Sequence, residues 1–353
     1  MSACALIMAG GTGGHIFPGL AVAEALRDKG WRVHWLGTPG SMESELVPAR
    51  GFALETIEFQ GVRGKGVMSL LGLPWRLLKA FWQSLVVLRR VQPDVVVGLG
   101  GYVSFPGGLM SALKGTPLVL HEQNSVAGMA NRWLATVAAR VFTAFPDVLN
   151  GAQWVGNPLR AAFTAQPAPA ERFAGRTGPL QVLVVGGSLG AKALNTVVPR
   201  ALALLPVDQR PQVLHQSGAK QIDDLRAHYQ AAGVQASLTP FIDDTASAFA
   251  QADLIVCRAG ASTVTEIAAV GAAAIYVPFP FAVDDHQTTN AQLLVAQGGG
   301  WLQQQSALTP EWLAAQWQNL TRAELLTKAQ AAWALRKTHA TQELVAACEE
   351  LAR

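Results

Sequence analysis

The stretch Gly10-Gly11-Thr12-Gly13-Gly14-His15 decides the fold of the first half of this chain. An apolar run over residues 3–9 leads into it, and a helical pattern over residues 20–29 follows, with Pro18 near its start. A strand, a glycine loop and a helix in this order are typical of a cradle for a phosphate or a sugar. A phosphate cradle needs no imidazole, so His15 at the end of the loop also indicates proton chemistry.

Strand and helix patterns alternate along the whole chain. In the first half, the predicted strands are 5–9, 32–36, 54–59, 95–99, 118–121, 141–144 and 154–155, and the predicted helices are 20–29, 43–50, 74–91, 105–114 and 126–138. The pattern restarts with a strand at 180–185, a second glycine loop at 186–190, a helix at 191–205, and strands at 212–216, 237–239, 254–257, 274–277 and 300–302. Each half therefore predicts a doubly wound parallel α/β sheet, with ligands at the carboxyl ends of its strands.

Length and composition favour a two-domain α/β enzyme. The chain has 353 residues, half of them hydrophobic and 14% charged, with a net charge of +3. That charge is no nucleic-acid signature, so we expect no nucleic-acid partner. Cys4, Cys257 and Cys348 lie far apart, and we expect buried thiols in a reducing compartment. We expect neither a signal peptide nor a membrane-spanning helix.

The domain boundaries follow from a composition break. Residues 165–179, rich in proline and alanine, are predicted to be a linker. Residues 311–353 are predicted to be helical throughout, with a final helix that crosses back onto the first domain. We therefore predict one domain over 1–160 with about 337–353 added, and a second over 161–336.

Both glycine loops fail the tests for a dinucleotide site. Ile16 stands where the first loop would need its third glycine, and Ser188 and Leu189 interrupt the second. Neither second strand ends in an acid for a ribose. The chain also lacks a P-loop motif and an Asp-x-Asp pair, so we expect no cofactor and no metal. A tight turn alone would explain one such loop, but two at equivalent positions favour ligand binding.

A polar cluster follows the strand at 254–257. The helix that opens near residue 261 would attract a diphosphate with its free N–H groups. Thr263 and Glu266 fit a capping box, but Glu266 also fits a carboxylate that binds ribose hydroxyls. Further along, Gln287 is predicted at the edge of the site, and Asp284 and Asp285 are predicted to cap the next helix.

These motifs occur together in one known family. The shared motifs, in order, are Gly10 to His15, Gly100-Gly101-Tyr102, His121-Glu122-Gln123-Asn124, Gly156-Asn157-Pro158 with Arg160, Gly186-Gly187-Ser188, Phe241-Ile242-Asp243-Asp244, Ala261 to Glu266, and His286-Gln287. Over essentially its whole length the chain resembles the MurG family, the N-acetylglucosaminyltransferases that complete the lipid-linked disaccharide of bacterial peptidoglycan. The resemblance implies a GT-B architecture, in which two Rossmann-like domains are separated by a deep cleft.

The resemblance also implies the substrates. The donor would be UDP-N-acetylglucosamine, and the acceptor undecaprenyl-diphospho-N-acetylmuramoyl-pentapeptide. The new linkage would be β-1,4, so the reaction would invert the donor's anomeric centre without a metal. Carried onto this sequence, the donor-site residues are Thr12, Gly13, Gly14, Asn124, Arg160, Ser188, Ile242 (through its backbone), Ala261, Ser262, Thr263, Val264, Thr265, Glu266 and Gln287. Gly101, Tyr102 and His121 would belong to the acceptor loops.

Two residues are candidates for the general base. A loop imidazole suits the removal of a proton from the acceptor hydroxyl, which makes His15 the first candidate. The alternative is that His15 only positions the acceptor diphosphate by hydrogen bonding. Glu122 is the rival base, and its alternative role is that of a structural carboxylate supporting the loops. We regard His121 as structural.

A membrane acceptor requires a route to the bilayer. Residues 63–90 carry apolar side chains interleaved with Arg76, Lys79, Arg89 and Arg90. Trp75, Leu78, Trp82 and Leu85 have helical spacing, which predicts a membrane patch that includes Lys79. The alternative is an ordinary helix with one stripe in the core. We expect a peripheral protein on the cytoplasmic side of the bacterial inner membrane, with an anionic bilayer and other cell-wall synthesis proteins as partners.

Two other functions fit the same residues. One is a metal-independent GT-B glycosyltransferase with a different acceptor, which the loops of the first domain would select. The other is a protein that binds a UDP-sugar without catalysis, against which His15, Glu122 and Asn124 argue weakly.

Overall fold

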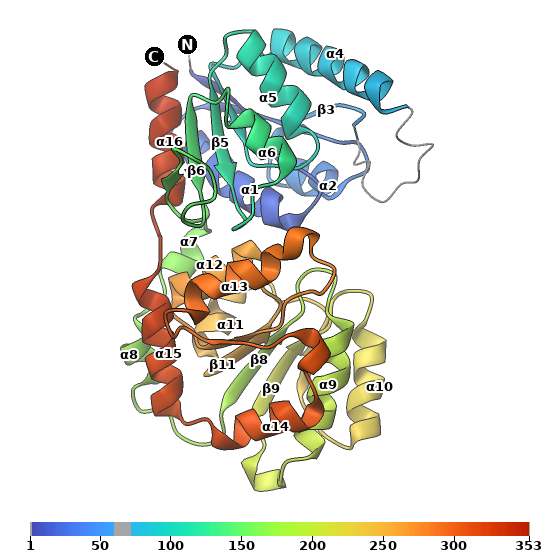
Figure 1. Ribbon diagram of the computed structural model, residues 1–353, viewed down its shortest axis with the longest axis vertical. Helices are drawn as coiled ribbons and strands as arrows, with labels where there is room; N and C mark the ends of the chain where they lie inside the picture. The colour runs from blue at the N-terminus through green and yellow to red at the C-terminus, as the bar shows by residue number, and fades with distance from the viewer. Residues whose placement is uncertain (1, 60–71, 353) are drawn as a thin grey trace. The chain divides into compact units, whose positions relative to one another are not determined.

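The computed structural model describes residues 2–59 and 72–352. The chain forms two compact units, Met1–Arg160 with Thr338–Arg353 and Ala161–Lys337. Each unit is built on one parallel sheet (Figure 1). The α/β fold class predicted from the sequence is confirmed.

The sheet of the first unit has seven parallel strands. In spatial order they are β3 (Ala53–Thr56), β2 (Arg32–Gly37), β1 (Cys4–Met8), β4 (Val95–Gly98), β5 (Leu118–Glu122), β6 (Arg140–Thr143) and β7 (Gln153–Trp154). The order reverses between β1 and β4, so the chain leaves neighbouring strands in opposite directions there. In parallel α/β sheets, ligands bind at the carboxyl ends of the strands beside this point.

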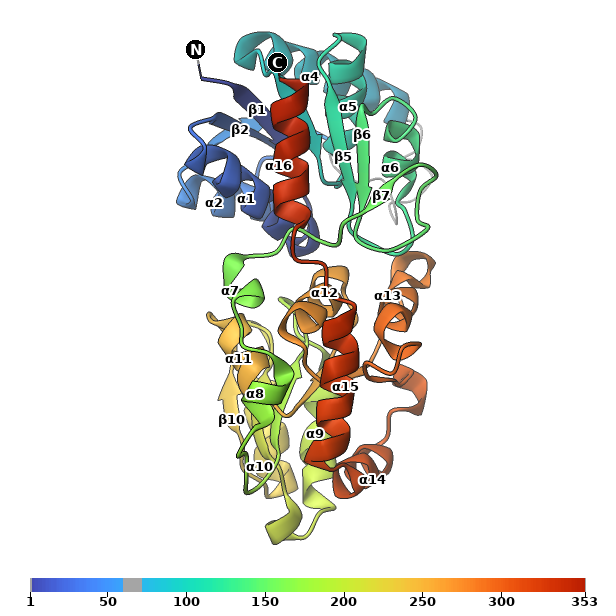
Figure 2. The same ribbon diagram turned by 90° about the vertical axis from the view of Figure 1, so that its left-hand side faces the viewer.

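Helices cover both faces of this sheet (Figure 2). One face carries α1 (Gly13–Asp28), α2 (Met42–Ala49) and α16 (Ala340–Leu351), and the other carries α4 (Leu73–Val91), α5 (Ser104–Leu113) and α6 (Met129–Leu134). Side chains alternate along β1: Ala5 and Ile7 pack towards the first group, and Leu6 and Met8 towards the second. Both faces are thus buried, as apolar parallel strands require.

The sheet of the second unit has six parallel strands. In spatial order they are β10 (Ser237–Thr239), β9 (Gln212–Gln216), β8 (Gln181–Val185), β11 (Leu254–Cys257), β12 (Ala274–Tyr276) and β13 (Trp301–Leu302). Its helices are α7 (Ala161–Thr164), α8 (Pro169–Phe173), α9 (Lys192–Ala203), α10 (Ile222–Ala232), α11 (Thr245–Gln251), α12 (Ala261–Val270), α13 (His286–Val295), α14 (Pro310–Asn319) and α15 (Arg322–Ala334). The order reverses between β8 and β11, so the switch point here lies beside the second glycine loop.

Some boundaries differ from the predictions. Helix α1 begins at Gly13, so His15 lies in its first turn and not in a loop. Glycine adopts the helical region as readily as positive φ, and the glycine run therefore did not mark where the helix starts. The predicted linker at 165–179 contains α8, which begins at Pro169 because proline suits the first turn of a helix.

The C-terminal segment is helical but not continuous. It forms α14, α15 and α16, and Thr321 caps α15 by accepting a hydrogen bond from the N–H of Glu324. Two helices were not predicted from the sequence: α10, which has 11 residues and two aspartates in its first turn, and α11, which has only seven residues. Helix α16 packs in the core of the first unit through Leu344, Val345 and Cys348.

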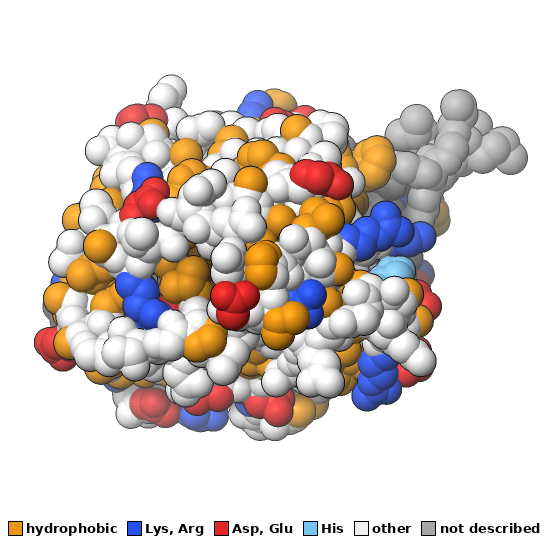
Figure 3. Space-filling model, turned by 90° about the horizontal axis from the view of Figure 1, so that it is seen from below, with side chains coloured by type: hydrophobic (Ala, Val, Ile, Leu, Met, Phe, Trp, Pro, Cys, Tyr) orange, Lys and Arg blue, Asp and Glu red, His pale blue; other side chains and the backbone are white. Residues whose placement is uncertain are grey.

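The surface mixes charge with apolar groups. Figure 3 shows one face, where acidic and basic side chains lie interspersed among apolar ones. Within residues 2–59 and 72–352, no helix is both long and apolar enough to span a bilayer. The three cysteines are buried thiols, as predicted for Cys4 and Cys257.

Candidate active site

The first glycine loop connects β1 to α1 at the carboxyl edge of the first sheet. Gly11 has a φ of +87°, and Thr12 is the N-cap residue of α1, with no side-chain cap of its own. His15 is the third residue of the helix and is partly exposed. The buried carboxylate of Glu43 accepts hydrogen bonds from the N–H groups of Gly11 (3.1 Å) and Thr38 (3.1 Å) and so holds this loop against the next one.

A second pair of glycines packs against this loop. Gly100 and Gly101 follow β4 with φ values of +99° and +86°. A Cβ on Gly101 would lie 2.4 Å from the carbonyl oxygen of Gly10, and a Cβ on Gly100 would lie 2.8 Å from Nδ1 of His15. Only glycine lets the backbone after β4 approach the first loop this closely.

The side chains of His15, Gln123 and His121 and the carbonyl of Gly156 form one chain of hydrogen bonds. Its Nδ1 lies 2.8 Å from Oε1 of Gln123. The Nε2 of Gln123 donates to Nδ1 of His121 (3.0 Å) and to the His121 carbonyl (3.1 Å). The Nε2 of His121 lies 2.8 Å from the carbonyl oxygen of Gly156. Gln123 therefore links the partly exposed imidazole to a buried one.

The His121 imidazole is fully buried, which favours a structural role over direct contact with the acceptor. Burial, together with the nearby His15 imidazole, lowers its pKa to about 4, against the opposing effect of the hydrogen bond to the Gly156 carbonyl. His121 is therefore neutral at pH 7 and carries one ring proton.

Glu122 is buried and surrounded by donors. Its Oε1 accepts from the N–H of Asn124 (2.9 Å) and from Nδ2 of the same residue (3.5 Å). Its Oε2 accepts from the N–H of Gly128 (3.1 Å) and from Nδ2 of Asn131 (2.8 Å). These four contacts order the loop after β5 and favour the role of a structural carboxylate over that of a base.

The remaining predicted residues of the first unit lie nearby. Tyr102 is half exposed directly after the glycine pair. The guanidinium of Arg160 lies over the ring of Phe17, 5.8 Å from its centroid, and so is held beside α1. Asn124 is partly exposed at the end of β5.

The second glycine loop occupies the same position in the second unit. Gly187 and Gly190 have φ values of +84° and +76°, and Ser188 between them is exposed. The Nε2 of Gln216 donates to the carbonyls of Gly187 (3.1 Å) and Pro240 (3.1 Å), which ties this loop to the one that carries Ile242. The Ile242 carbonyl accepts a hydrogen bond from the Thr245 hydroxyl (3.1 Å).

Helix α12 presents its N-terminus at the end of β11. Gly260 is its N-cap residue, with no side-chain cap, so the predicted capping box between Thr263 and Glu266 is wrong. Thr263 already lies inside the helix, and a Cβ on Gly260 would lie 3.9 Å from its Oγ1, which therefore points back towards the helix start. Glu266 is partly exposed one turn further on.

Three other predicted residues of α12 differ in what their side chains can offer. The Oγ of Ser262 is buried and has no hydrogen-bond partner among the described residues. The side chain of Val264 is fully buried, and the hydroxyl of Thr265 bonds to the carbonyls of Ala261 and Ser262. Neither the Val264 nor the Thr265 side chain is therefore available to a ligand at the helix start.

Gln287 joins two loops at this edge. Its Oε1 accepts from the N–H groups of Ala259 (3.2 Å) and Phe279 (2.9 Å), which follow β11 and β12. This geometry turns the amide nitrogen away from both loops. Asp285 is the N-cap residue of α13, but its carboxylate accepts from the Thr288 hydroxyl (2.8 Å) and not from a backbone N–H, so the predicted cap is only positional.

Four organising residues escaped the sequence reading. Gln123 belongs to the motif His121-Glu122-Gln123-Asn124, and its spacing of two residues from His121 at the end of a strand could have indicated a contact between their side chains. Glu43, Gln216 and Arg258 carried no local signal, because most of their partners are backbone groups of other loops. Arg258 donates to the carbonyls of Val277 and Pro278 and to Oε1 of Gln305, fixing the end of β11.

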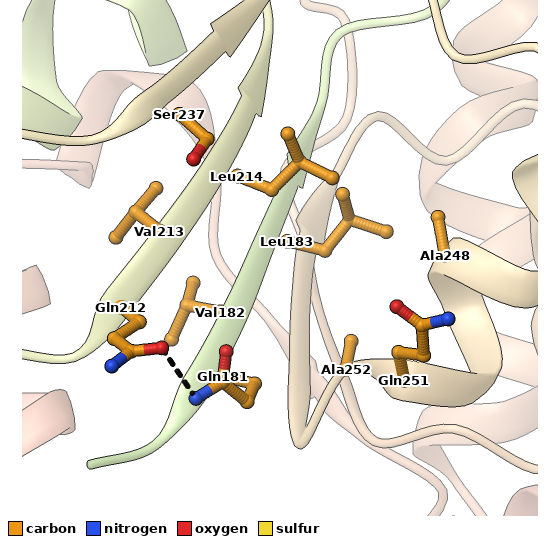
Figure 4. Close-up of a pocket in the computed structure, with 10 residues that line it drawn as sticks. All are labelled: Gln181, Val182, Leu183, Gln212, Val213, Leu214, Ser237, Ala248, Gln251 and Ala252. Atoms are coloured by element: carbon orange, nitrogen blue, oxygen red, sulfur yellow. Dashed lines mark hydrogen bonds between the residues drawn. The ribbon is translucent and has the colours of Figure 1, made fainter.

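A separate cavity of about 300 Å³ lies at the opposite end of the second sheet (Figure 4). The residues around it come from β8 and β9, from the start of β10 and from α11 and its end, and its polar side chains are those of Gln181, Gln212, Gln251 and Ser237. With neutral groups and no glycine loop, this cavity lacks the features of a diphosphate site.

The predicted membrane helix α4 has one exposed apolar face and one face in the core. Trp75, Leu78 and Trp82 of α4 are 75%, 61% and 66% exposed, while Leu88 is buried and Leu77 packs against the core. Lys79 pairs with Glu58 (2.5 Å). Met129 and Trp133 of α6, on the same face of the sheet, are also largely exposed. The residues 63–71 of the predicted patch lie outside the described residues.

Comparison with known proteins agrees with this geometry. Residues 5–143 match the glycosyltransferase family 28 N-terminal domain, and residues 181–348 match the glycosyltransferase family 28 C-terminal domain. Curated relatives from Polaromonas naphthalenivorans and Paracidovorax citrulli are 71% and 70% identical, over 99% and 98% of this chain and 98% of each relative. Both are named UDP-N-acetylglucosamine–N-acetylmuramyl-(pentapeptide) pyrophosphoryl-undecaprenol N-acetylglucosamine transferase.

Solved structures extend the comparison. The crystal structure of Acinetobacter baumannii MurG is 40% identical, with a TM-score of 0.86 and 99% of both chains covered. The glycosyltransferase of kitacinnamycin has a TM-score of 0.69 at 17% identity, covers 99% of this chain and 98% of its own, and shares the fold.

Proposed function

The chain belongs to glycosyltransferase family 28, and we propose that it transfers N-acetylglucosamine from UDP-N-acetylglucosamine to the C4 hydroxyl of undecaprenyl-diphospho-N-acetylmuramoyl-pentapeptide. Relatives about 70% identical over their full length are named for this transfer. The reaction inverts the anomeric centre and yields the lipid-linked disaccharide from which peptidoglycan is built.

The position of His15 is the observation that carries the proposal. The imidazole is partly exposed in the first turn of α1, at the carboxyl edge of the sheet and beside two glycine loops. In the proposed reaction it removes the proton of the acceptor hydroxyl as that oxygen attacks the anomeric carbon. Glu122 acts through the loop after β5, because its oxygens are already engaged by four donors.

The second unit binds the donor in this proposal. The first N–H groups of α12 and the Thr263 hydroxyl receive the diphosphate, whose charge grows as UDP leaves. Glu266 accepts the ribose hydroxyls. The uracil is read through the backbone of Ile242, whose carbonyl also accepts a hydrogen bond from the Thr245 hydroxyl. Gln287 offers its amide nitrogen to the sugar hydroxyls.

The first unit binds the acceptor and the membrane. Tyr102 and Gly101 shape the acceptor pocket, with Arg160, Thr12 and Asn124 near the donor sugar. The exposed tryptophans of α4 insert into the interface of an anionic bilayer on the cytoplasmic side of the inner membrane. Aromatic side chains with adjacent cations suit this interfacial position.

A transfer assay tests the proposal. The wild-type chain, given UDP-N-acetylglucosamine and a short-chain lipid-diphospho-muramoyl-pentapeptide, should form the disaccharide. His15→Ala should lower kcat by about 100- to 10,000-fold, the usual contribution of a general base, and leave the affinity for UDP unchanged. His34→Ala, which removes an imidazole from β2, is the control and should stay active. No transfer by the wild-type chain would refute the proposal.

A further inference from the structure

We infer that Gln123 is a positioning residue, which fixes the tautomer of His15 so that its Nε2 carries the lone pair that accepts the substrate proton. The inference rests on the proposed role of His15 as base. It follows from the chain of contacts that runs from Gly156 through His121 and Gln123 to His15.

The first step starts at the buried end. The Gly156 carbonyl can only accept, so the Nε2 of His121, 2.8 Å away, must carry a proton. His121 is buried and neutral and has only one ring proton to give. Its Nδ1 is therefore a bare acceptor, and the group of Gln123 that faces it at 3.0 Å must be a donor.

The second step fixes the amide of Gln123. The same end of the amide also lies 3.1 Å from the backbone carbonyl of His121, which is a second acceptor. Two acceptors at one end require the NH₂ group there, and a flipped amide would place oxygen against oxygen. The oxygen of Gln123 therefore faces His15.

The third step reaches the reactive ring. An amide oxygen only accepts, so Nδ1 of His15, at 2.8 Å, must be protonated. A neutral His15 then has its lone pair on Nε2. The two histidines consequently hold opposite tautomers, with the proton on Nδ1 in His15 and on Nε2 in His121.

The chemistry of the transfer follows. The C4 oxygen of the acceptor forms its bond to the anomeric carbon, and its proton passes to the lone pair on Nε2 of His15. The bond from the anomeric carbon to the diphosphate breaks, and UDP leaves with that electron pair. The imidazolium still donates from Nδ1 to the Gln123 oxygen and later releases the Nε2 proton to solvent.

The tautomers are measurable without any substrate. Long-range ¹⁵N–¹H correlation spectra of the full chain, labelled at histidine, separate protonated from bare ring nitrogens, and His15→Ala identifies the His15 signals. At a pH where His15 is neutral, we expect a protonated Nδ1 and a bare Nε2. The reverse tautomer in the wild-type chain would overturn the inference, whether or not the chain transfers sugar.

A substitution tests the consequence for catalysis. Gln123→Met keeps the length of the side chain and removes both hydrogen-bonding groups. We expect kcat to fall about 10- to 100-fold, the UDP affinity to stay unchanged, and the His15 tautomers to mix. Gln83→Met is the control, because it removes an amide that accepts a hydrogen bond from the Glu58 N–H, away from His15. A Gln123→Met chain that keeps both the kcat and the His15 tautomer of the wild type would refute the inference.

Discussion

Gly100 lies so close to His15 that a Cβ on Gly100 would come within 2.8 Å of Nδ1 and 2.9 Å of Cε1. The backbone of Gly100 also has a φ of +99°, which other residues rarely adopt. The absence of a side chain at Gly100 thus lets the loop after β4 pack against the imidazole, which is hydrogen-bonded to Gln123.

We predict that Gly100→Ala impairs both catalysis and stability. The methyl group must displace the His15 ring and break its hydrogen bond to Gln123, so kcat should fall at least 10-fold. Backbone strain should lower the free energy of unfolding by about 1–3 kcal/mol. Transfer assays and urea unfolding measure the two effects.

Gly115→Ala separates the strain from the contact. Gly115 has a φ of +77° in the same unit, but a Cβ there meets no atom within 4 Å. Its alanine variant should lose similar stability and keep its kcat. Equal losses of kcat in both variants would show that the contact with His15 does not matter.

Glu122→Gln should act through the loop and not through proton transfer. The amide would turn an NH₂ group towards groups that are themselves donors, at a cost of about 1–3 kcal/mol in the free energy of unfolding. Any remaining activity should keep the pH dependence of the wild type. Glu58→Gln, at an exposed ion pair, is the control and should change stability by less than about 0.5 kcal/mol. A large loss of kcat at full stability would restore Glu122 as the base.

The elements that the sequence predicted best are those with strong local patterns. The strand at 254–257, an uninterrupted apolar run, has the predicted bounds, and so do the more polar strands at 212–216 and 237–239. The start of α1 was wrong because glycine permits both loop and helix, and α8 was missed because five residues give no periodicity.

In the candidate site, too, the sequence indicated some residues but not the contacts that they make. His15, Glu122 and Glu266 stood out by residue type, but the structure was needed to distinguish a partly exposed imidazole from a carboxylate saturated with donors. Glu43 joins Gly11 to Thr38 through backbone N–H groups. Backbone partners leave no trace in the residue types, so no pattern could have predicted this contact.

Two threonines of α12 provide a test of the donor site. The Thr263 hydroxyl points towards the helix start, whereas the Thr265 hydroxyl bonds within the helix. Thr263→Val should weaken UDP binding about 10-fold, as expected for the loss of one hydrogen bond to a charged group. Thr265→Val should leave the affinity unchanged. Calorimetric titration with UDP measures both, and equal affinities of the two variants would contradict a diphosphate at this helix.

The exposed tryptophans of α4 should determine membrane binding. Trp75→Ser combined with Trp82→Ser should reduce flotation with anionic vesicles at least 10-fold, because each ring loses its interfacial burial. Leu204→Ser with Val207→Ser, two exposed apolar residues of the second unit, is the control and should float like the wild type. Transfer to a short-chain acceptor should persist in both double variants. Unchanged flotation of the tryptophan variant would exclude this patch.

Two buried histidines should make the chain sensitive to acid. Burial lowers the pKa of His121 to about 4 and that of His215 to about 3. Above pH 6.5 both histidines are neutral in the folded and the unfolded chain, and they add no pH dependence. Below pH 6.5 only the unfolded chain takes up these protons, so each histidine should lower the free energy of unfolding by about 1.4 kcal/mol per pH unit, until the pH reaches its folded pKa.

His215→Gln isolates one of the two contributions. His215 is hydrogen-bonded to Tyr229 and Asn195, and a glutamine there cannot titrate. Between pH 6.5 and 4, the wild-type chain should lose about 3.5 kcal/mol more than this variant, which is 2.5 pH units at about 1.4 kcal/mol each. Urea unfolding at half-unit pH steps measures the difference. Parallel losses in the two chains would mean that His215 is protonated in the folded state well above pH 4, and that its burial does not exclude the proton.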